Sequence, residues 1–174
     1  MTELKNYIKD YPHFPKEGIL FKDMFPLLRN PTAWNKAIDQ LGEFCDDVNP
    51  DCVVGIDSRG FIVGTALALK KNLSFVPIRK KGKLPGNLWS IEYDLEYGKD
   101  TLEIQKDSFT KGTRVLLVDD LLATGGTVKA SLRLLDLAGA NVVGCGFIIE
   151  LLSLNGRNYI KDIPIKSLIS YEDT

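Results

Sequence analysis

Two adjacent carboxylates, Asp119 and Asp120, stand between a hydrophobic run and a glycine-rich loop in the sequence VLLVDDLLATGGT at residues 115–127. The hydrophobic run has the length and composition of a buried strand. After the loop, apolar residues recur at helical spacing from Val128 to Leu135. A strand–loop–helix corner directs backbone N–H groups and the positive end of a helix dipole at one point. The stretch therefore predicts a phosphate-binding corner with carboxylates beside it.

The loop residues add the chemistry that a sugar phosphate requires. Gly125 and Gly126 allow a tight turn and a close approach to an anion. Thr124 and Thr127 can donate hydroxyl hydrogen bonds, and the two carboxylates are acceptors suited to a diol or its metal ion. The sequence contains neither GxxxxGK[ST] nor GxGxxG, so it has neither the P-loop nor the dinucleotide fingerprint.

Two further polar segments follow predicted strands. Asp57, Ser58 and Arg59 come directly after CVVGI, and Arg59 at a helix N-terminus can bind an anion through charge-assisted hydrogen bonds. The basic run RKKGK begins at Arg79 and extends to Lys83. Each segment alone has an ordinary explanation, an Arg capping a loop or a solvated basic loop. Their convergence at the carboxyl ends of strands, where parallel sheets bind ligands, favours a shared site.

The elements that position these residues alternate between strands and helices. Strands are predicted at 52–56, 74–79, 101–105, 115–118, 141–149 and 165–171, and helices at 2–10, 31–46, 61–71 and after residue 127. Residues 14–28 read as an irregular folded segment, and residues 90–109 as an extended hairpin that bends near Gly98. The pattern predicts one α/β domain over residues 1–174, built on a mainly parallel sheet.

Composition and charge exclude several classes of partner and site. The net charge of -1 gives no field for attracting nucleic acid or an anionic membrane, so neither is expected as a partner. The N-terminus has no signal-peptide pattern, and no apolar run approaches membrane-spanning length. Cys45, Cys52 and Cys145 have no metal-binding spacing and predict reduced core thiols in a cytoplasmic protein. The single histidine, His13, excludes a multi-histidine metal site.

The motif VLLVDDLLATGGT closely resembles the phosphoribosyl diphosphate (PRPP) signature of the type I phosphoribosyltransferases. Together with FPKEGILFKD at 14–23 and LEYGK at 95–99, it makes nearly the whole chain similar to the adenine phosphoribosyltransferases. The resemblance implies a mainly parallel twisted sheet flanked by helices, with a base-binding segment at 14–28 and a mobile hood at 90–109. It also implies a cis peptide between Asp57 and Ser58.

The same resemblance implies roles for the site residues. PRPP would be bound by Asp119, Asp120, Ala123, Thr124, Gly125, Gly126 and Thr127, and pyrophosphate by Asp57, Ser58, Arg59, Arg79 and Lys83. Adenine would lie among Leu20, Phe21, Lys22 and Leu151, with Phe21 stacked on the purine. Catalysis would depend on Glu96, Tyr97 and Arg59. Many relatives carry Arg at the position of Lys22, a departure with little weight if the base is read through the backbone.

The activity implied is transfer of the phosphoribosyl group from PRPP to adenine, giving AMP and pyrophosphate. Magnesium would be the cofactor, held mainly by substrate and water rather than by a protein cage. Arg79 and Lys83 match a basic loop that acts on the neighbouring subunit, which implies a homodimer. Two alternatives stay open: a phosphoribosyltransferase for another purine, and a non-catalytic protein that senses PRPP. The FPKEGILF and LEYGK segments argue against the first, and the low charge argues against a nucleic-acid-binding regulator.

Overall fold

The computed structural model describes residues 3–94 and 98–172. Within them, a seven-stranded sheet has the order β5-β6-β4-β3-β7-β8-β9. Strands β4, β3, β7, β8 and β9 run parallel, and the hairpin β5–β6 joins antiparallel to β4. The strand bounds are β3 Cys52–Ile56, β4 Ser74–Lys80, β5 Leu88–Asp94, β6 Lys99–Gln105, β7 Arg114–Leu122, β8 Asn141–Leu151 and β9 Ile165–Tyr171. The predicted α/β class with a mainly parallel sheet is confirmed.

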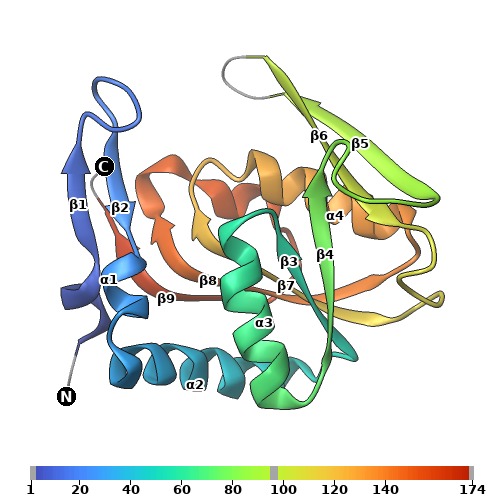
Figure 1. The fold of residues 1–174 in the computed structure, drawn as a ribbon, viewed down its shortest axis with the longest axis horizontal. Coiled ribbons are helices and arrows are strands. Elements are labelled where there is room, and N and C mark those ends of the chain that lie inside the picture. The colour runs from blue at the N-terminus through green and yellow to red at the C-terminus, as the bar shows by residue number, and fades with distance from the viewer. Residues whose placement is uncertain (1–2, 95–97, 173–174) are drawn as a thin grey trace.

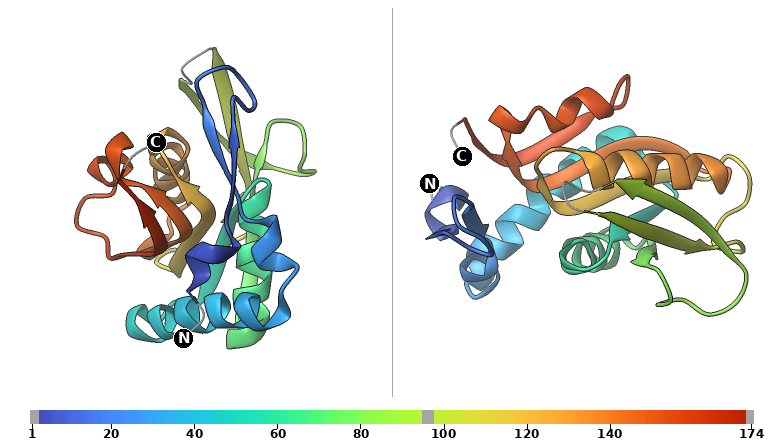
Figure 2. Two further views of the ribbon diagram at one scale, coloured as in Figure 1. Left: turned by 90° about the vertical axis from the view of Figure 1, so that its left-hand side faces the viewer. Right: turned by 90° about the horizontal axis from the view of Figure 1, so that it is seen from above.

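Helices cover both faces of this sheet (Figures 1 and 2). On one face lie α2 (Pro31–Val48) and α3 (Arg59–Lys71), and on the other lies α4 (Gly126–Leu137). Alternate residues of each central strand therefore enter different cores: Leu116 packs with α2 and α3, whereas Leu117 packs with α4. Burial on both faces explains why these strands read as continuous hydrophobic runs.

The start and end of α2 follow from local sequence. The side chain of Asn30 accepts a hydrogen bond from the backbone N–H of Ala33 at 3.0 Å, and Pro31 occupies the first turn. At the other end, Asn49 adopts a left-handed conformation with φ 45°. Its N–H donates to the carbonyl of Cys45 at 2.9 Å. The predicted helix over 31–46 is confirmed and extends to Val48.

The N-terminal prediction was wrong. Instead of a helix over 2–10, a 3-10 turn at Leu4–Tyr7 leads into strand β1 (Lys9–Pro12), which pairs antiparallel with β2 (Leu20–Asp23). The pairing partner lies beyond a loop, so the local pattern does not reveal it. A short helix α1 (Phe25–Leu28) then completes the segment predicted as irregular.

Strand β7 is longer than predicted. It continues past Val118 to Leu122, because Leu121 and Leu122 pair with Ile149 and Glu150 of β8. Asp119 and Asp120 thus lie within the strand rather than beyond its end. They are fixed by sheet hydrogen bonding as well as by the loop that follows.

Two other sequence predictions are confirmed. The β5–β6 hairpin pairs Asp94 with Lys99, and Gly98 has φ 91°, which suits the predicted bend. The three cysteines are free and buried, and burial raises the pKa of Cys145 to about 12.

Among the described residues, no helix has the length and apolar character needed to cross a bilayer.

Candidate active site

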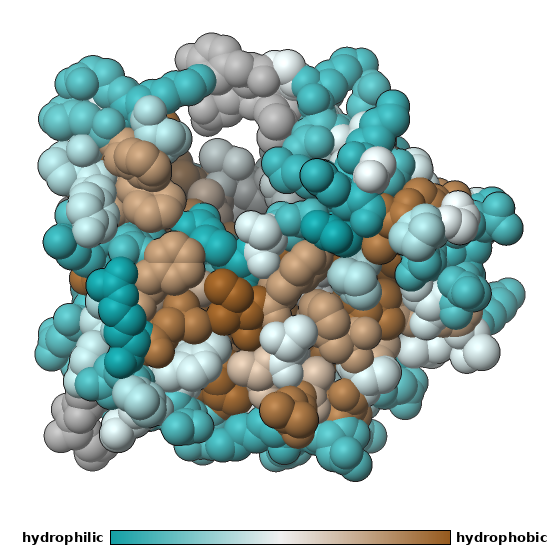
Figure 3. Space-filling view, in the orientation of Figure 1, coloured by the Kyte–Doolittle hydropathy of each residue, from teal (hydrophilic) through white to brown (hydrophobic). Residues whose placement is uncertain are grey.

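A cleft of about 330 Å³ lies at the carboxyl ends of the central strands. It is lined by Asp57, Ser58, Arg59, Lys80, Tyr93, Asp100, Leu102, Asp119, Asp120 and Thr127. A second hollow of about 190 Å³ shares several of these residues and extends along the loop at 123–127, which we call the phosphate loop because its sequence predicts phosphate binding. Figure 3 shows this face hollowed between the β1–β2 hairpin and the β5–β6 hairpin. The structure therefore brings together the segments after β3, β4 and β7, as predicted.

The two carboxylates at the centre of the cleft have different partners. Nε of Arg59 lies 2.8 Å from Oδ2 of Asp120, whose side chain is only 7% exposed. Oδ1 of Asp119 accepts the backbone N–H of Asp120 at 2.9 Å. Burial and then the neighbouring charge of Asp120 raise the pKa of Asp119. Burial also raises the pKa of Asp120, and Arg59 opposes that shift. Burial and mutual repulsion thus disfavour the ionised forms of this pair, and a nearby cation would favour them.

The first turn of α3 is packed tightly against this pair. A Cβ atom on Gly60 would lie 2.9 Å from Oδ1 of Asp119 and 3.0 Å from the carbonyl oxygen of Val118. Only glycine permits that approach, which sets the distance between Arg59 and β7. The glycine in the Asp57–Gly60 segment therefore has a packing role that the sequence did not reveal.

The phosphate loop joins β7 to α4 through Gly125, which has φ 83°. The residue precedes the first turn of α4, so the N–H groups at the start of the helix face the second hollow. Ala123, Thr124, Gly126 and Thr127 line the same hollow. This arrangement gives an anion both backbone donors and the positive end of the helix dipole.

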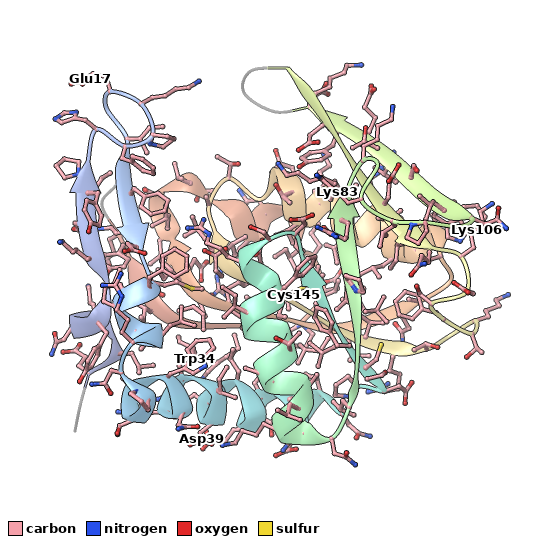
Figure 4. The ribbon with its side chains drawn as sticks, viewed as in Figure 1. Glu17, Trp34, Asp39, Lys83, Lys106 and Cys145 are labelled. Atoms are coloured by element: carbon pink, nitrogen blue, oxygen red, sulfur yellow. The ribbon has the colours of Figure 1, made fainter. Side chains whose placement is uncertain are left out.

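The segment after β3 contains the expected cis peptide between Asp57 and Ser58. Oδ2 of Asp57 lies 3.2 Å from Nε of Arg79, and the backbone N–H of Lys80 donates to the same oxygen at 3.4 Å. The end of β4 is thus tied to the segment after β3. Lys83 lies in the loop beyond β4 (Figure 4) and is not among the residues that line the cleft.

Phe21 in β2 lies beside Arg59, the cation that pairs with Asp120. The guanidinium carbon of Arg59 is 5.2 Å from the ring centroid of Phe21, and the ring of Phe14 meets it edge-on at 5.1 Å. Nζ of Lys22 points elsewhere, to Oδ2 of Asp10 at 2.8 Å and over the ring of Tyr171. Because that side chain is buried in its own contacts, only the backbone of Lys22 is left to meet a ligand. Leu20 is half-buried in the same strand.

The remaining predicted site residues are Leu151, Glu96 and Tyr97. Leu151 is the last residue of β8, 8% exposed, and is paired with Tyr171 of β9. Glu96 and Tyr97 lie outside the described residues. The described strands of their hairpin, β5 and β6, carry Tyr93 and Asp100 into the cleft wall.

Sequence reasoning missed Tyr93 and Asp100 as cleft residues, and it included Lys80 only as part of the basic run at 79–83. Nζ of Lys80 lies 3.1 Å from Oδ2 of Asp100, and the hydroxyl of Tyr93 donates to the same oxygen at 3.5 Å. Burial raises the pKa of Asp100, but the backbone N–H of Thr101, then Lys80 and Tyr93, lower it further, so the net shift is downward. Tyr93 alternates with the exposed Glu92 and Asp94. That period-two pattern was the one available signal that it faces inward.

Comparison with known proteins gives consistent results. Residues 27–172 match the family model for the phosphoribosyl transferase domain. An adenine phosphoribosyltransferase of Prochlorococcus marinus (strain MIT 9313) is 56% identical over 170 residues, covering 97% of this chain and 99% of the relative.

Solved structures agree in fold. The crystal structure of adenine phosphoribosyltransferase from Thermoanaerobacter pseudethanolicus has a TM-score of 0.93 at 44% identity, covering 97% of this chain and 98% of the other. The Saccharomyces cerevisiae enzyme, in complex with an imino-altritol bisphosphate and adenine, has a TM-score of 0.89 at 44% identity, covering 95% of this chain and 96% of the other.

The mainly parallel sheet flanked by helices is the fold of the type I phosphoribosyltransferases, and the chain belongs to the phosphoribosyltransferase family. Within that family it stands with the adenine phosphoribosyltransferases, because the relative and both solved structures carry that name over nearly their full length.

Proposed function

We propose that this chain transfers the 5-phosphoribosyl group from PRPP to N9 of adenine, giving AMP and pyrophosphate in purine salvage. The observation that carries the proposal is the pairing of Arg59 with Asp120 at 2.8 Å, directly beside the phosphate loop. The loop at 123–127, the two carboxylates and the Arg59 guanidinium therefore line two hollows that share residues. That order matches the 5-phosphate, ribose diol and pyrophosphate of PRPP.

Binding of PRPP begins with its 5-phosphate in the phosphate loop, held by Ala123, Thr124, Gly125, Gly126 and Thr127. Asp119 and Asp120 then accept hydrogen bonds from the ribose hydroxyls. As the bond between C1 and the pyrophosphate oxygen breaks, positive charge develops on the ribose. With the ribose bound in this way, the two carboxylates would lie beside that charge and stabilise the transition state with little reorganisation.

Pyrophosphate departs toward the segment after β3, where Asp57, Ser58 and Arg59 line the cleft. Arg59 supplies positive charge to the leaving group. In a homodimer, Arg79 and Lys83 of the partner subunit would complete this subsite. Within one chain, Nε of Arg79 lies 3.2 Å from Oδ2 of Asp57, and Lys83 is exposed in the loop beyond β4.

Magnesium fits the donor chemistry of the cleft. Asp57, Asp100, Asp119 and Asp120 offer carboxylate oxygens, the ligands that this ion prefers. In the described ranges, no group of three or more His, Cys, Asp and Glu side chains could hold a metal, so substrate oxygens and water would supply most ligands. When bound, the ion neutralises the charge of pyrophosphate. Asp119 and Asp120 would orient it through the ribose hydroxyls.

Adenine would lie between Phe21 and Leu151, with the backbone of Leu20 and Lys22 reading its N1 and exocyclic amine. The 5.2 Å distance between the Arg59 guanidinium carbon and the Phe21 ring centroid supports a base pocket next to the proposed ribose site. In this proposal, residues 14–28 are the base-pocket segment of a single phosphoribosyltransferase domain. Buried backbone partners left unpaired by hypoxanthine would give the preference for adenine.

Residues 90–109 would act as a mobile hood over the cleft. Glu96 would handle the proton on the imidazole edge of the purine, and Tyr97 would help to cover the ribose. Closure excludes water from the cationic transition state. We place the protein in the cytoplasm, with no nucleic-acid or membrane partner, in keeping with its net charge of -1 and its three free buried cysteines.

The experiment that tests this function is AMP formation from adenine and PRPP with magnesium, with hypoxanthine and guanine assayed in parallel. Turnover of adenine alone is the expected result. Turnover of another base would retain the PRPP assignments and overturn the roles of Phe21 and Leu151. PRPP binding without turnover of any base would indicate a PRPP-sensing protein and leave Glu96 without a catalytic role.

Replacement of Gly125 by Ala is expected to raise the KM for PRPP roughly 5- to 30-fold, because a left-handed conformation costs a non-glycine residue about 1–2 kcal/mol. The new Cβ would also lie 2.6 Å from the carbonyl oxygen of Gly156 and push the loop away. Steady-state kinetics with PRPP varied at saturating adenine measure the effect.

Gly126→Ala provides the comparison, because a Cβ there meets no atom within 4 Å and the backbone has an ordinary φ. Its effect on the KM for PRPP should be clearly smaller. Equal effects of the two substitutions would contradict the proposed conformational role of Gly125.

A further inference from the structure

The phosphate loop rests directly on the turn that follows β8. This turn, residues 152–160, consists of two 3-10 segments, Leu152–Leu154 and Gly156–Tyr159. In Figure 1 it forms the red-orange coils beside the loop that precedes α4. A Cβ on Gly125 would lie 2.6 Å from the carbonyl oxygen of Gly156, and a Cβ on Gly156 would clash with the carbonyl oxygen of Ala123. Backbone therefore touches backbone, and the position of Gly156 limits the shape of the phosphate loop.

One ion pair fixes the position of Gly156. The next residue, Arg157, binds Glu150 with two nitrogens, and its NH2 lies 2.6 Å from Oε2 of Glu150. The Glu150 side chain is 3% exposed, whereas that of Arg157 is 47% exposed. Burial raises the pKa of Glu150 and the hydrogen bond from Arg157 lowers it, with a net shift below the ordinary value. The carboxylate is thus a charged, two-point anchor for the turn.

The anchor is itself held by the sheet. Glu150 lies in β8, where it pairs with Leu122 of β7 on one side and Ser170 of β9 on the other. Leu122 directly precedes the phosphate loop. Glu150 is therefore fixed relative to the start of the loop. Because Arg157 is bound to Glu150, the turn on the far side of the loop is fixed relative to the same strand.

Two further contacts support the turn at its end. Ile160 is 4% exposed in the core beneath α4, and Nζ of Lys129 in α4 lies 4.6 Å from the ring centroid of Tyr159. The turn thus contacts the helix whose N-terminus would bind the phosphate. Neither Glu150 nor Arg157 lines the cleft or the hollow along the loop, so we assign the pair a positioning role rather than a binding role.

We propose that the Glu150–Arg157 ion pair is a positioning device that holds the phosphate loop, through Gly156, in the shape that binds the 5-phosphate of PRPP. The proposal rests on the function proposed above. It predicts a selective effect: loss of the pair weakens binding of the 5-phosphate and leaves the pyrophosphate subsite on the other side of the cleft intact.

The test measures binding of ribose 5-phosphate and of pyrophosphate with magnesium, each by isothermal titration calorimetry, to the full chain and to Glu150→Gln. Ribose 5-phosphate carries the 5-phosphate without the leaving group. Its Kd is expected to rise about tenfold, the lower range for loss of a side chain that orients a binding group. The Kd for pyrophosphate should stay the same.

Arg157→Lys is the second variant, because it keeps the positive charge but cannot bind both carboxylate oxygens. It should weaken ribose 5-phosphate binding less than Glu150→Gln, and it provides the test if Glu150→Gln does not fold. Asp39→Asn is the matched control, since Asp39 forms an exposed ion pair with Lys70 between α2 and α3. That variant should bind both ligands as the unchanged protein does.

The outcomes separate this inference from the proposed function. Unchanged ribose 5-phosphate binding in a folded variant, or equal weakening of both ligands, would overturn the inference alone. Failure of the unchanged protein to bind ribose 5-phosphate would overturn the phosphate-loop assignment itself, and the inference with it.

Discussion

Replacement of Asp120 by Asn should reduce kcat/KM for PRPP by about 10³-fold, the upper range for removal of one electrostatic group from a preorganised site. The substitution keeps the shape of the side chain but removes its charge. Asp120 is buried and pairs with Arg59 at 2.8 Å, so the neutral amide would leave that cation unbalanced beside the ribose. An unbalanced cation would oppose the positive charge that develops at C1.

The measurement is steady-state AMP formation with each substrate varied. The fold should persist, because Asn matches Asp in size and removes the repulsion that raises the pKa of Asp119. Asp136→Asn is the control, since Asp136 is exposed on α4, away from the cleft. Turnover equal to that of the unchanged protein would rule out an electrostatic role for Asp120.

The second large effect is expected at Glu96. Glu96→Gln should cut kcat by about 10²-fold, the usual size of a general acid–base contribution. The amide keeps similar dimensions but does not exchange a proton with the purine imidazole. The KM for PRPP should change little, since the phosphate loop and carboxylate pair are untouched. Single-turnover measurements would separate loss of chemistry from slower product release.

Glu92→Gln is the matched control for Glu96. Glu92 lies on the same hairpin, exposed and 2.7 Å from Nζ of Lys99 in β6. Exposed ion pairs contribute little to the free energy of folding, so this variant should keep both its fold and its turnover. If both variants lost turnover equally, the hairpin as a whole would be responsible, and Glu96 would have no specific role in proton transfer.

The strand–loop–helix unit from β7 to α4 could be predicted from sequence because its determinants are contiguous. A strand run, two carboxylates, a glycine turn and an apolar helix face all fall within residues 115–137. Local turn chemistry and periodicity specify such a unit without long-range information. The strands at 52–56 and 165–171 have the predicted bounds for the same reason: each is a short apolar run that the sheet buries.

Predictions failed where pairing across distance decided the structure. Residues 9–12 became β1 rather than helix because β2 supplies a hydrogen-bonding partner. Strand β7 extended past its aspartates because β8 continues alongside it. The local sequence pattern contains no information about the partner strand. The ends of strands and short hairpins are therefore the least predictable elements.

By itself, the sequence determined the class of the sheet, the phosphate loop and the carboxylate pair, since these depend on neighbouring residues and on the alternation of strands and helices. Only the tertiary structure decided which charges meet. It paired Arg59 with Asp120, brought Lys80 and Asp100 into one wall, and set Gly125 against Gly156. These contacts join residues from different elements. Their distances follow from how strands pair and helices pack, which no single segment of sequence encodes.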